Sequence, residues 1–349
     1  MVDQDRLERI LHAAVKAPSG DNSQPWSFHI QKDKLSILVH PERDHAILNV
    51  ESRGTYLSLG AVIENLVTAA AYEGFECEIS YPFDVHAATV VHFIETRAST
   101  HRLSEAIDNR HTNRGPYHEH ITDDALTTLR SIHAEGVRIS IINDKHAIRT
   151  IAGAVSMMEE AALRTKELHQ LFFQSIVWDS RRNASGAPGL YIKTTELPLP
   201  IQMLFRLIRY WSIMRALNLI GFARVAAKSN AAIYASSGAI AAISIEHTQP
   251  LDYVHAGRVF ERLWLHATDM GLAAQPLAGL LYLSTYLSRQ DRIHIERDLQ
   301  ERILDAARTI HRIFGSEQGT IAMLLRLGEP LRPATARSRR MPPAIIHSV

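Results

Sequence analysis

The sequence predicts an α+β fold made of two related copies of one unit, with helices around sheets rich in antiparallel strands. Two observations support this prediction. Apolar periodicity gives the series helix, loop, strands, helix, strands over roughly the first hundred residues, and a similar series then begins again. In addition, two helical segments, Gly60 to Phe75 and Gly257 to Leu272, align without a gap. A chain of 349 residues is long enough for two such units.

The aligned segments share more residues than two unrelated amphipathic helices need to share. Six of their sixteen positions are identical, and apolar residues match between them. We interpret this as an internal duplication, with a first half over residues 1–98 and a second half over residues 99–349. The identical pairs are Gly60 and Gly257, Val62 and Val259, Glu64 and Glu261, Leu66 and Leu263, Ala70 and Ala267, and Gly74 and Gly271.

The first half begins with a predicted helix over residues 3–16, which we expect to end before Pro18. The segment Ala17 to Trp26 follows and is dense in turn-forming residues whose side chains donate and accept hydrogen bonds. It is either an ordinary surface turn or a loop that binds a polar ligand. The remaining predicted elements are strands at 28–30 and 35–40, a buried helix over 56–72 that ends at Gly74, and strands near 76–80 and 88–94.

The second half repeats this order but is longer. Its additional residues lie between about 165 and 235, and long insertions of this size often form lids or binding loops. The insert includes the polar run Ser180 to Gly189 and an amphipathic segment from Leu204 to Phe222. The other predicted elements are a helix at 102–108, a basic stretch, a helix over 123–133 and a strand over 137–142.

The basic stretch Arg110-His111-Thr112-Asn113-Arg114 combines two guanidinium groups, an imidazole and a hydroxyl. In an extended backbone alternate residues point the same way, so Arg110, Thr112 and Arg114 share one face. The fork-shaped donors of that face suit a phosphate group. The alternative is a solvated basic turn whose charges pair with Asp108 and Glu119.

Composition narrows the class of protein. The net charge of +1 argues against a nucleic-acid binder held by bulk electrostatics, and the single cysteine excludes an intrachain disulfide. The first residues carry no basic and apolar leader pattern, so we expect a cytoplasmic protein. The spacing of His118 and His120 is not that of metal ligands, and we expect no metal site.

The segment from Leu197 to Phe222 is the most membrane-like part of the chain. Arg206, Arg209 and Arg215 interrupt it, so we predict an amphipathic helix and no integral membrane segment. A further hypothesis is that these three arginines, together with Trp211, dock the protein on an anionic membrane surface.

Four short motifs together resemble the nitroreductase family of flavin oxidoreductases. The first is the loop Pro18-Ser19-x-x-Asn22-x-Gln24-Pro25-Trp26, and the second is Arg110-His111-Thr112-x-Arg114. The third is the late helix end and turn from Gly271 to Gly279. The fourth is the C-terminal basic group before Pro342. The resemblance spans most of the chain and implies a nitroreductase-like fold that binds FMN.

The resemblance implies a role for individual residues of each motif. Arg110, Thr112 and Arg114 would hold the FMN phosphate and ribityl oxygens, with His111 as a further donor and Arg114 near N1 and O2 of the ring. The first-half loop (Pro18, Ser19, Asn22 and Gln24) would contact the ring or ribityl chain. The backbone of Pro276, Leu277, Ala278 and Gly279 would face N5. The basic group of Arg337, Arg339 and Arg340 would close on the phosphate, Arg340 foremost.

The order of the motifs departs from the common family pattern. There, the phosphate motif and the Pro-Ser-x-x-Asn loop occur in one copy, and a homodimer builds each flavin site. Here the first half carries only the loop and the second half only the phosphate motif. This resembles the Acg-type branch, in which one chain imitates the dimer, and implies one FMN per chain. Further dimerisation of such a chain remains open.

The implied function is that of an oxidoreductase. It would transfer hydride from NAD(P)H through FMN to a small-molecule acceptor, such as a nitroaromatic or a quinone. Because the flavin carries this chemistry, no catalytic side chain is expected. Ala278 stands where some relatives have an acid, so substrate handling can differ. The alternative is an FMN-sequestering protein whose insert covers the flavin and leaves little or no reductase activity.

Overall fold

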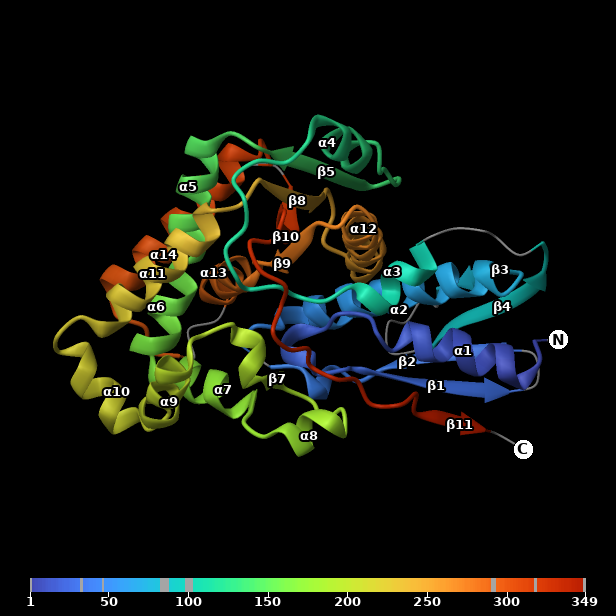
Figure 1. The fold of residues 1–349 in the computed structure, drawn as a ribbon, viewed down its shortest axis with the longest axis horizontal. Helices are drawn as coiled ribbons and strands as arrows, with labels where there is room; N and C mark the ends of the chain where they lie inside the picture. Colours follow the sequence, from blue (N-terminus) through green and yellow to red (C-terminus); the bar gives the residue numbers. More distant parts are fainter. Residues whose placement is uncertain are drawn as a thin grey trace.

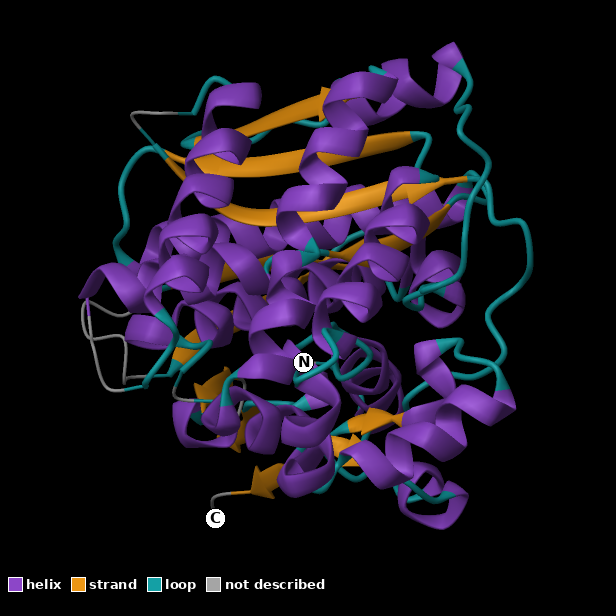
Figure 2. Ribbon diagram, turned by 90° about the vertical axis from the view of Figure 1, so that its left-hand side faces the viewer, coloured by secondary structure: helices purple, strands orange, loops and turns teal. Residues whose placement is uncertain are grey.

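The computed structural model describes residues 2–31, 34–45, 47–81, 88–97, 103–289, 293–316 and 319–347. Two main β-sheets lie on opposite sides of a group of helices, and further helices cover the second sheet (Figures 1 and 2). The predicted α+β class, with helices around antiparallel-rich sheets, is confirmed. The predicted boundary between residues 98 and 99 lies outside the described residues.

The first sheet has five strands in the order β11-β1-β2-β4-β3. Its four consecutive strands come from the first half, as predicted, and pair antiparallel. The chain end then returns to this sheet, because β11 pairs parallel with β1. The C-terminal segment therefore crosses from the second half to the first. The strands are β1 (Trp26–Gln31), β2 (Lys34–Val39), β3 (Phe75–Ser80), β4 (Thr89–Glu95) and β11 (Ile345–His347).

The second sheet has four antiparallel strands in the order β5-β8-β10-β9. Every residue of β8 is buried, because helices cover the sheet. The strands are β5 (Val137–Ile142), β8 (Ala239–Ile245), β9 (Ala273–Pro276) and β10 (Thr320–Gly328). The surrounding helices are α4 (Asp123–Arg130), α5 (Lys145–Val155), α6 (Met157–Arg164), α11 (Phe222–Ala235), α13 (Gly279–Arg289) and α14 (Arg297–Ile313).

Two long helices, α2 (Arg53–Tyr72) and α12 (Pro250–Asp269), lie between the sheets (Figure 1). Helix α2 packs on the first sheet and α12 on the second, and the two helices pack on each other. At their contact Gly60 lies against Gly257: a Cβ added to Gly257 would lie 2.0 Å from the Leu57 carbonyl oxygen, and one added to Gly60 would lie 2.9 Å from the Gly257 Cα. The duplicated segments thus meet at their shared glycine, as expected if one chain imitates a symmetric dimer.

The short helices near the first sheet follow the predicted pattern. Helix α1 (Gln4–Ala14) begins after Asp3, whose side chain accepts a hydrogen bond from the Arg6 backbone N–H, and it ends before Pro18. Helix α3 (Leu103–Asn109) leads directly into the basic stretch, as predicted. The helix predicted over 123–133 is shorter, because α4 ends at Arg130.

The insert between 165 and 235 forms a separate small layer. Its parts are α7 (Lys166–Gln174), β6 (Ile176–Val177), α8 (Ser180–Ala184), β7 (Leu190–Tyr191), α9 (Leu199–Ile208) and α10 (Trp211–Asn218). The insert ends with α11, which packs on α5 and α6 beside the second sheet. The expectation of one amphipathic helix over Leu197 to Phe222 is wrong. Tyr210 adopts an extended backbone, with φ −81° and ψ 116°, and this separates α9 from α10. No helix in the described ranges is long and apolar enough to cross a membrane.

Candidate functional site

A cavity of about 580 Å³ lies where the two halves meet, within the size range of cofactor pockets. The loop after α1, the basic stretch, the turn after β9, the insert and the C-terminal segment all line it. Most of the residues predicted from the sequence are therefore brought together. Those that line the cavity are Pro18, Ser19, Asn22, Arg110, His111, Thr112, Arg114, Pro276, Ala278, Gly279, Arg337, Arg339 and Arg340.

Two of the predicted residues, Gln24 and Leu277, are absent from the lining. Gln24 is buried and joins three segments instead. Its Nε2 donates to the Gly186 carbonyl oxygen of the insert at 3.0 Å, and its Oε1 accepts from the Met341 backbone N–H at 2.7 Å. Gln24 thus holds the loop, the insert and the C-terminal segment in place rather than facing the cavity.

The loop that precedes β1 has a strained backbone. Asp21, Asn22 and Gln24 have φ values of 45°, 60° and 53°, in the left-handed region that side chains rarely adopt. The Ser19 hydroxyl supports this turn by accepting a hydrogen bond from the Gln24 backbone N–H at 3.0 Å. Asn22 donates from Nδ2 to the Arg339 carbonyl oxygen at 2.9 Å. Its buried Oδ1 has no partner among the described residues and remains an available acceptor.

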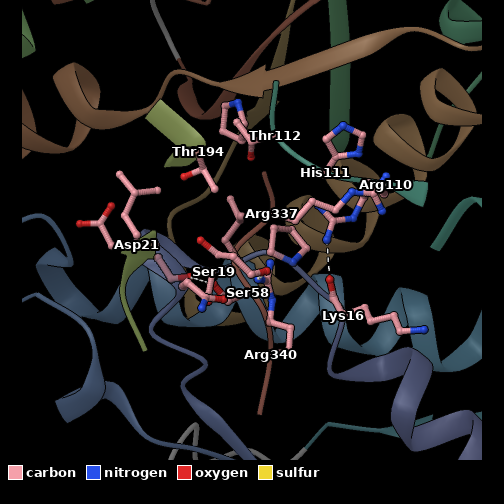
Figure 3. A pocket seen from close by; sticks show the side chains of 18 of the residues that line it. Lys16, Ser19, Asp21, Ser58, Arg110, His111, Thr112, Thr194, Arg337 and Arg340 are labelled. Carbon is pink, nitrogen blue, oxygen red and sulfur yellow. Dashed lines mark hydrogen bonds between the residues drawn. The ribbon is translucent and has the colours of Figure 1, made fainter. Parts of the chain in front are cut away.

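The basic stretch runs beside β9. Thr112 forms a parallel bridge with Ala274, and the Asn113 backbone N–H donates to the Ala274 carbonyl oxygen at 3.1 Å. Arg110, Thr112 and Arg114 all line the same cavity, but so does the intervening His111, so the alternation of faces stays a prediction. Figure 3 shows Arg110, His111 and Lys16 on one side of the cavity and Asp21 on the opposite side, with Arg337 and Arg340 between them.

Arg110 is buried and already has several partners. Its Nε lies 2.7 Å from Oε1 of the buried Glu261, and its guanidinium lies over the Trp264 ring at 4.4 Å from the centroid. It also donates to the Lys16 carbonyl oxygen. Burial raises the pKa of Glu261 to about 7, although the nearby Arg110 lowers it. Arg110 therefore joins the basic stretch to α12 in addition to facing the cavity.

The alternative of a solvated basic turn is wrong. Asp108 pairs with Lys16, and Glu119 pairs with Lys145, rather than either of them with Arg110 or Arg114. Arg114 instead donates to the Thr194 carbonyl oxygen of the insert at 3.0 Å. Burial lowers the pKa of Arg114, while the negative charge of Asp21 raises it.

The C-terminal segment brings three more cations to the cavity. Arg337 donates to the Asp108 carbonyl oxygen at 2.8 Å, and Arg340 donates to the carbonyl oxygens of Ala17 at 3.2 Å and Ser338 at 3.0 Å. In the described part of the chain no carboxylate lies within 4.0 Å of Arg340, which is half-buried. Burial and then the nearby Arg110 lower the pKa of Arg340. An anion in the cavity would relieve this repulsion.

The charges of the residues that line the cavity also favour a bound anion. The cationic residues are Lys16, Arg110, Arg114, Arg337, Arg339 and Arg340, and the acidic residues are Asp21, Asp44 and Asp108. Lys16 and Asp108 neutralise each other. The remaining cations exceed the remaining acids and come from two separate segments, the basic stretch and the C-terminal segment. Such a lining favours an anionic ligand with hydroxyl and amide groups.

The sequence did not indicate a cluster of two carboxylates and one imidazole at the cavity wall. His45 Nε2 lies 3.4 Å from Asp21 Oδ2, and the adjacent Asp44 accepts hydrogen bonds from Ser23 and Thr55. The hydrogen bond with Asp21 raises the pKa of His45, and burial opposes it. Burial raises the pKa of Asp21, but His45 and other partners lower it overall. No motif joins these residues, because a turn and a hairpin separate them in the sequence.

This pair predicts a pH effect on stability. Folding raises the pKa of His45 above its unfolded value of 6.5. The stabilisation that protonated His45 gives the folded protein is therefore complete below pH 6.5 and is lost as the pH rises through the folded-state pKa. His45→Asn should therefore flatten the fall in urea midpoint between about pH 6 and pH 8. The difference should stay below about 1 kcal/mol, since both side chains are about a third exposed. Equal pH slopes for the two proteins would contradict this.

The insert contributes Leu190 and Thr194 to the cavity wall. It is held there by the C-terminal segment: the Tyr191 backbone N–H donates to the Ser338 hydroxyl at 3.1 Å, and Asn183 Nδ2 donates to the Arg337 carbonyl oxygen at 3.1 Å. Insert and C-terminal segment therefore form one connected wall of the cavity.

Comparison with known proteins gives relatives along almost the whole chain. No family model matches. A Mycobacterium tuberculosis H37Rv protein named "Putative NAD(P)H nitroreductase Rv3131" is 24% identical to this chain. The match covers 96% of this chain and 90% of that protein. An uncharacterized protein, MT1398, of M. tuberculosis CDC 1551 is 24% identical over 98% of this chain, which spans only 48% of that protein.

A third relative and a solved structure complete the comparison. The M. tuberculosis H37Rv protein named "Putative NAD(P)H nitroreductase acg" is 28% identical over 50% of this chain and 54% of its own length. The FMN-dependent nitroreductase NfnB of Mycobacterium smegmatis, solved with NADPH, is 13% identical over 68% of this chain and 94% of its own, with a TM-score of 0.38. The sequence relatives confirm that this chain resembles the nitroreductase family, and its Acg-like members in particular.

Proposed function

We propose that the protein binds one FMN in this cavity and acts as an NAD(P)H-dependent oxidoreductase on a small acceptor such as a nitroaromatic or a quinone. The observation that carries the proposal is the convergence of four separate motifs on one cationic cavity. The names of the relatives, which are those of NAD(P)H nitroreductases, support it.

The cavity fits a flavin mononucleotide in its donor set. The phosphate needs cations without carboxylate partners, and among the described residues no carboxylate lies within 4.0 Å of Arg340. The ribityl hydroxyls need acceptors and donors, and Asn22 Oδ1 is a buried acceptor without a partner among the described residues. Thr112 and Ser19 add hydroxyl groups to the cavity lining. Each half of the chain therefore supplies part of the site.

FMN, when bound, supplies the hydride chemistry, and the protein has to hold and orient it. Arg340 and Arg337 would hold the phosphate. Arg114 places a positive charge beside the turn after β9, where it would stabilise negative charge on a bound ligand. The backbone of this turn, from Pro276 to Gly279, would lie against the ring. His45 and Asp21 could exchange a proton with a bound molecule, since both line the cavity.

One observation favours the second candidate function, FMN sequestration. The insert is fastened to the C-terminal segment and to Gln24 by hydrogen bonds, and it forms part of the cavity wall. If this wall stays closed over bound flavin, nicotinamide has no space to stack, and turnover would be slow or absent.

Anaerobic reduction of the reconstituted protein distinguishes these functions. We expect the protein to take up one FMN per chain, and NADPH or NADH to bleach the visible flavin absorbance within seconds. Rapid reoxidation by a nitroaromatic or a quinone would then identify the acceptor class. Bound flavin that resists reduction would favour sequestration. A protein that takes up no FMN would contradict both functions.

A further inference from the structure

The insert carries an exposed apolar surface that the proposed site does not use. Of the thirteen large hydrophobic residues that are exposed in the described part of the chain, nine lie between Leu199 and Val225. Leu219 and Ile220 are 87% and 79% exposed. Exposed apolar residues gathered in this way indicate an interaction site.

These residues are organised on the helices of the insert. On α9, Leu199, Met203 and Leu207 are spaced four residues apart and so form one exposed stripe. The opposite side of the layer has its own core, in which Ile208 and Met214 are fully buried. The outer stripe is therefore not the result of poor internal packing. Figure 1 shows α9 and α10 at the edge of the molecule, away from both main sheets.

The charge of this surface is of one sign. Between residues 197 and 245 the sequence contains no Asp or Glu, but it contains five cations: Arg206, Arg209, Arg215, Arg224 and Lys228. Arg224 pairs with Glu160. Within the described ranges, no carboxylate lies within 4.0 Å of the other four, and all four are exposed. Exposed apolar residues and cations without a carboxylate neighbour in these ranges thus lie on the same helices; Arg206 and Arg209 additionally lie over the Trp178 ring.

We propose that this basic apolar surface, formed by α9, α10 and the start of α11, docks the protein on a membrane rich in anionic phospholipids. Amphipathic helices bind the membrane interface with apolar side chains in the acyl region and Lys or Arg at the headgroups, and this surface supplies both. A second copy of the chain is a poorer occupant, because a symmetric contact would bring the same cations together. The proposal does not depend on flavin binding.

Vesicle flotation tests this proposal on the full-length protein. We expect at least about tenfold more protein on vesicles of phosphatidylcholine with phosphatidylglycerol than on phosphatidylcholine alone. This binding should disappear when the salt is raised from about 0.05 M to about 0.5 M. Failure to bind the anionic vesicles at low salt would overturn the proposal.

Variants with matched controls locate the surface. The triple variant Arg206→Gln, Arg215→Gln and Lys228→Gln should lose at least about tenfold in binding. The control Arg297→Gln, Arg308→Gln and Arg312→Gln removes three exposed charges from α14 and should bind like the unmodified chain. Equal loss in both variants would mean non-specific adsorption and would overturn the proposal.

The apolar component needs its own variant. Leu219→Ser with Ile220→Ser keeps all cations and should also weaken vesicle binding, whereas Leu251→Ser with Leu331→Ser should not. Light scattering without lipid provides the last check. A stable dimer that Leu219→Ser with Ile220→Ser dissociates would assign the surface to a second copy and overturn the proposal. Thermal unfolding of each variant verifies that it is folded.

Discussion

Arg340→Ala is expected to weaken FMN binding by about 10- to 100-fold, which corresponds to the loss of one charge-assisted hydrogen bond. Arg340 is half-buried, has no carboxylate partner in the described part of the chain, and donates only to backbone carbonyl oxygens. A phosphate would provide the anion that it lacks. Because Arg340 makes no ion pair within 4.0 Å in the described ranges, the free energy of unfolding of the apoprotein should change by less than about 1 kcal/mol. Fluorescence titration with FMN and urea unfolding measure the two quantities.

Arg110 provides the comparison for this prediction. Removing Arg110 leaves the buried Glu261 without its cation, so Arg110→Ala should cost about 3–5 kcal/mol in stability as well as weakening FMN binding. The double variant Arg110→Met with Glu261→Gln removes both charges and should regain most of the stability. If the double variant binds FMN as tightly as the unmodified chain, the Arg110 charge is not needed for the phosphate. If Arg340→Ala binds FMN normally, the assignment of the phosphate to the C-terminal segment is wrong.

Local patterns predicted much of the fold and of the cavity lining. The Pro18 loop and the Arg110 stretch could be identified because each gathers polar or cationic side chains within a few residues, where a turn or an extended backbone makes them available to a ligand. The relation between α2 and α12 was predictable because identical residues, including Gly60 and Gly257, recur at one spacing. These signals lie within short segments, where local geometry determines which side chains point together.

The remaining features depend on contacts between segments far apart in the sequence. Glu261 was predicted only as part of the duplication, and nothing in its helix indicates that it pairs with Arg110. Its duplicate, Glu64, pairs with Arg258 and Arg262 instead, so the two halves use equivalent carboxylates differently. The pairing of His45 with Asp21 could likewise not be predicted from a local pattern. The same is true of Gln24, which holds the C-terminal segment only because separate segments meet there.

Gly257→Ala is expected to destabilise the whole molecule by about 3 kcal/mol, an unusually large effect for one added methyl group. The reason is the contact between α2 and α12. The new Cβ would lie 2.0 Å from the Leu57 carbonyl oxygen, so the helix backbones must move apart. The same movement would separate Gly60 from its neighbours, because the two glycines face each other. Since α2 packs on the first sheet and α12 on the second, separating the two helices loosens the core that joins the two halves.

Urea unfolding followed by circular dichroism measures this effect, with Gly153→Ala as the matched control. Gly153 also lies within a helix, α5, but it is exposed, and a Cβ there would meet no atom within 4 Å. The control should be more stable than the unmodified chain by about 0.5–1 kcal/mol, because alanine favours the helix over glycine. Because the stability changes of the two variants have opposite signs, they distinguish the effect of close helix packing from that of helix propensity. If Gly257→Ala is also stabilised, the two helices are not packed through their shared glycines, and the structural basis for a chain that imitates a dimer is lost.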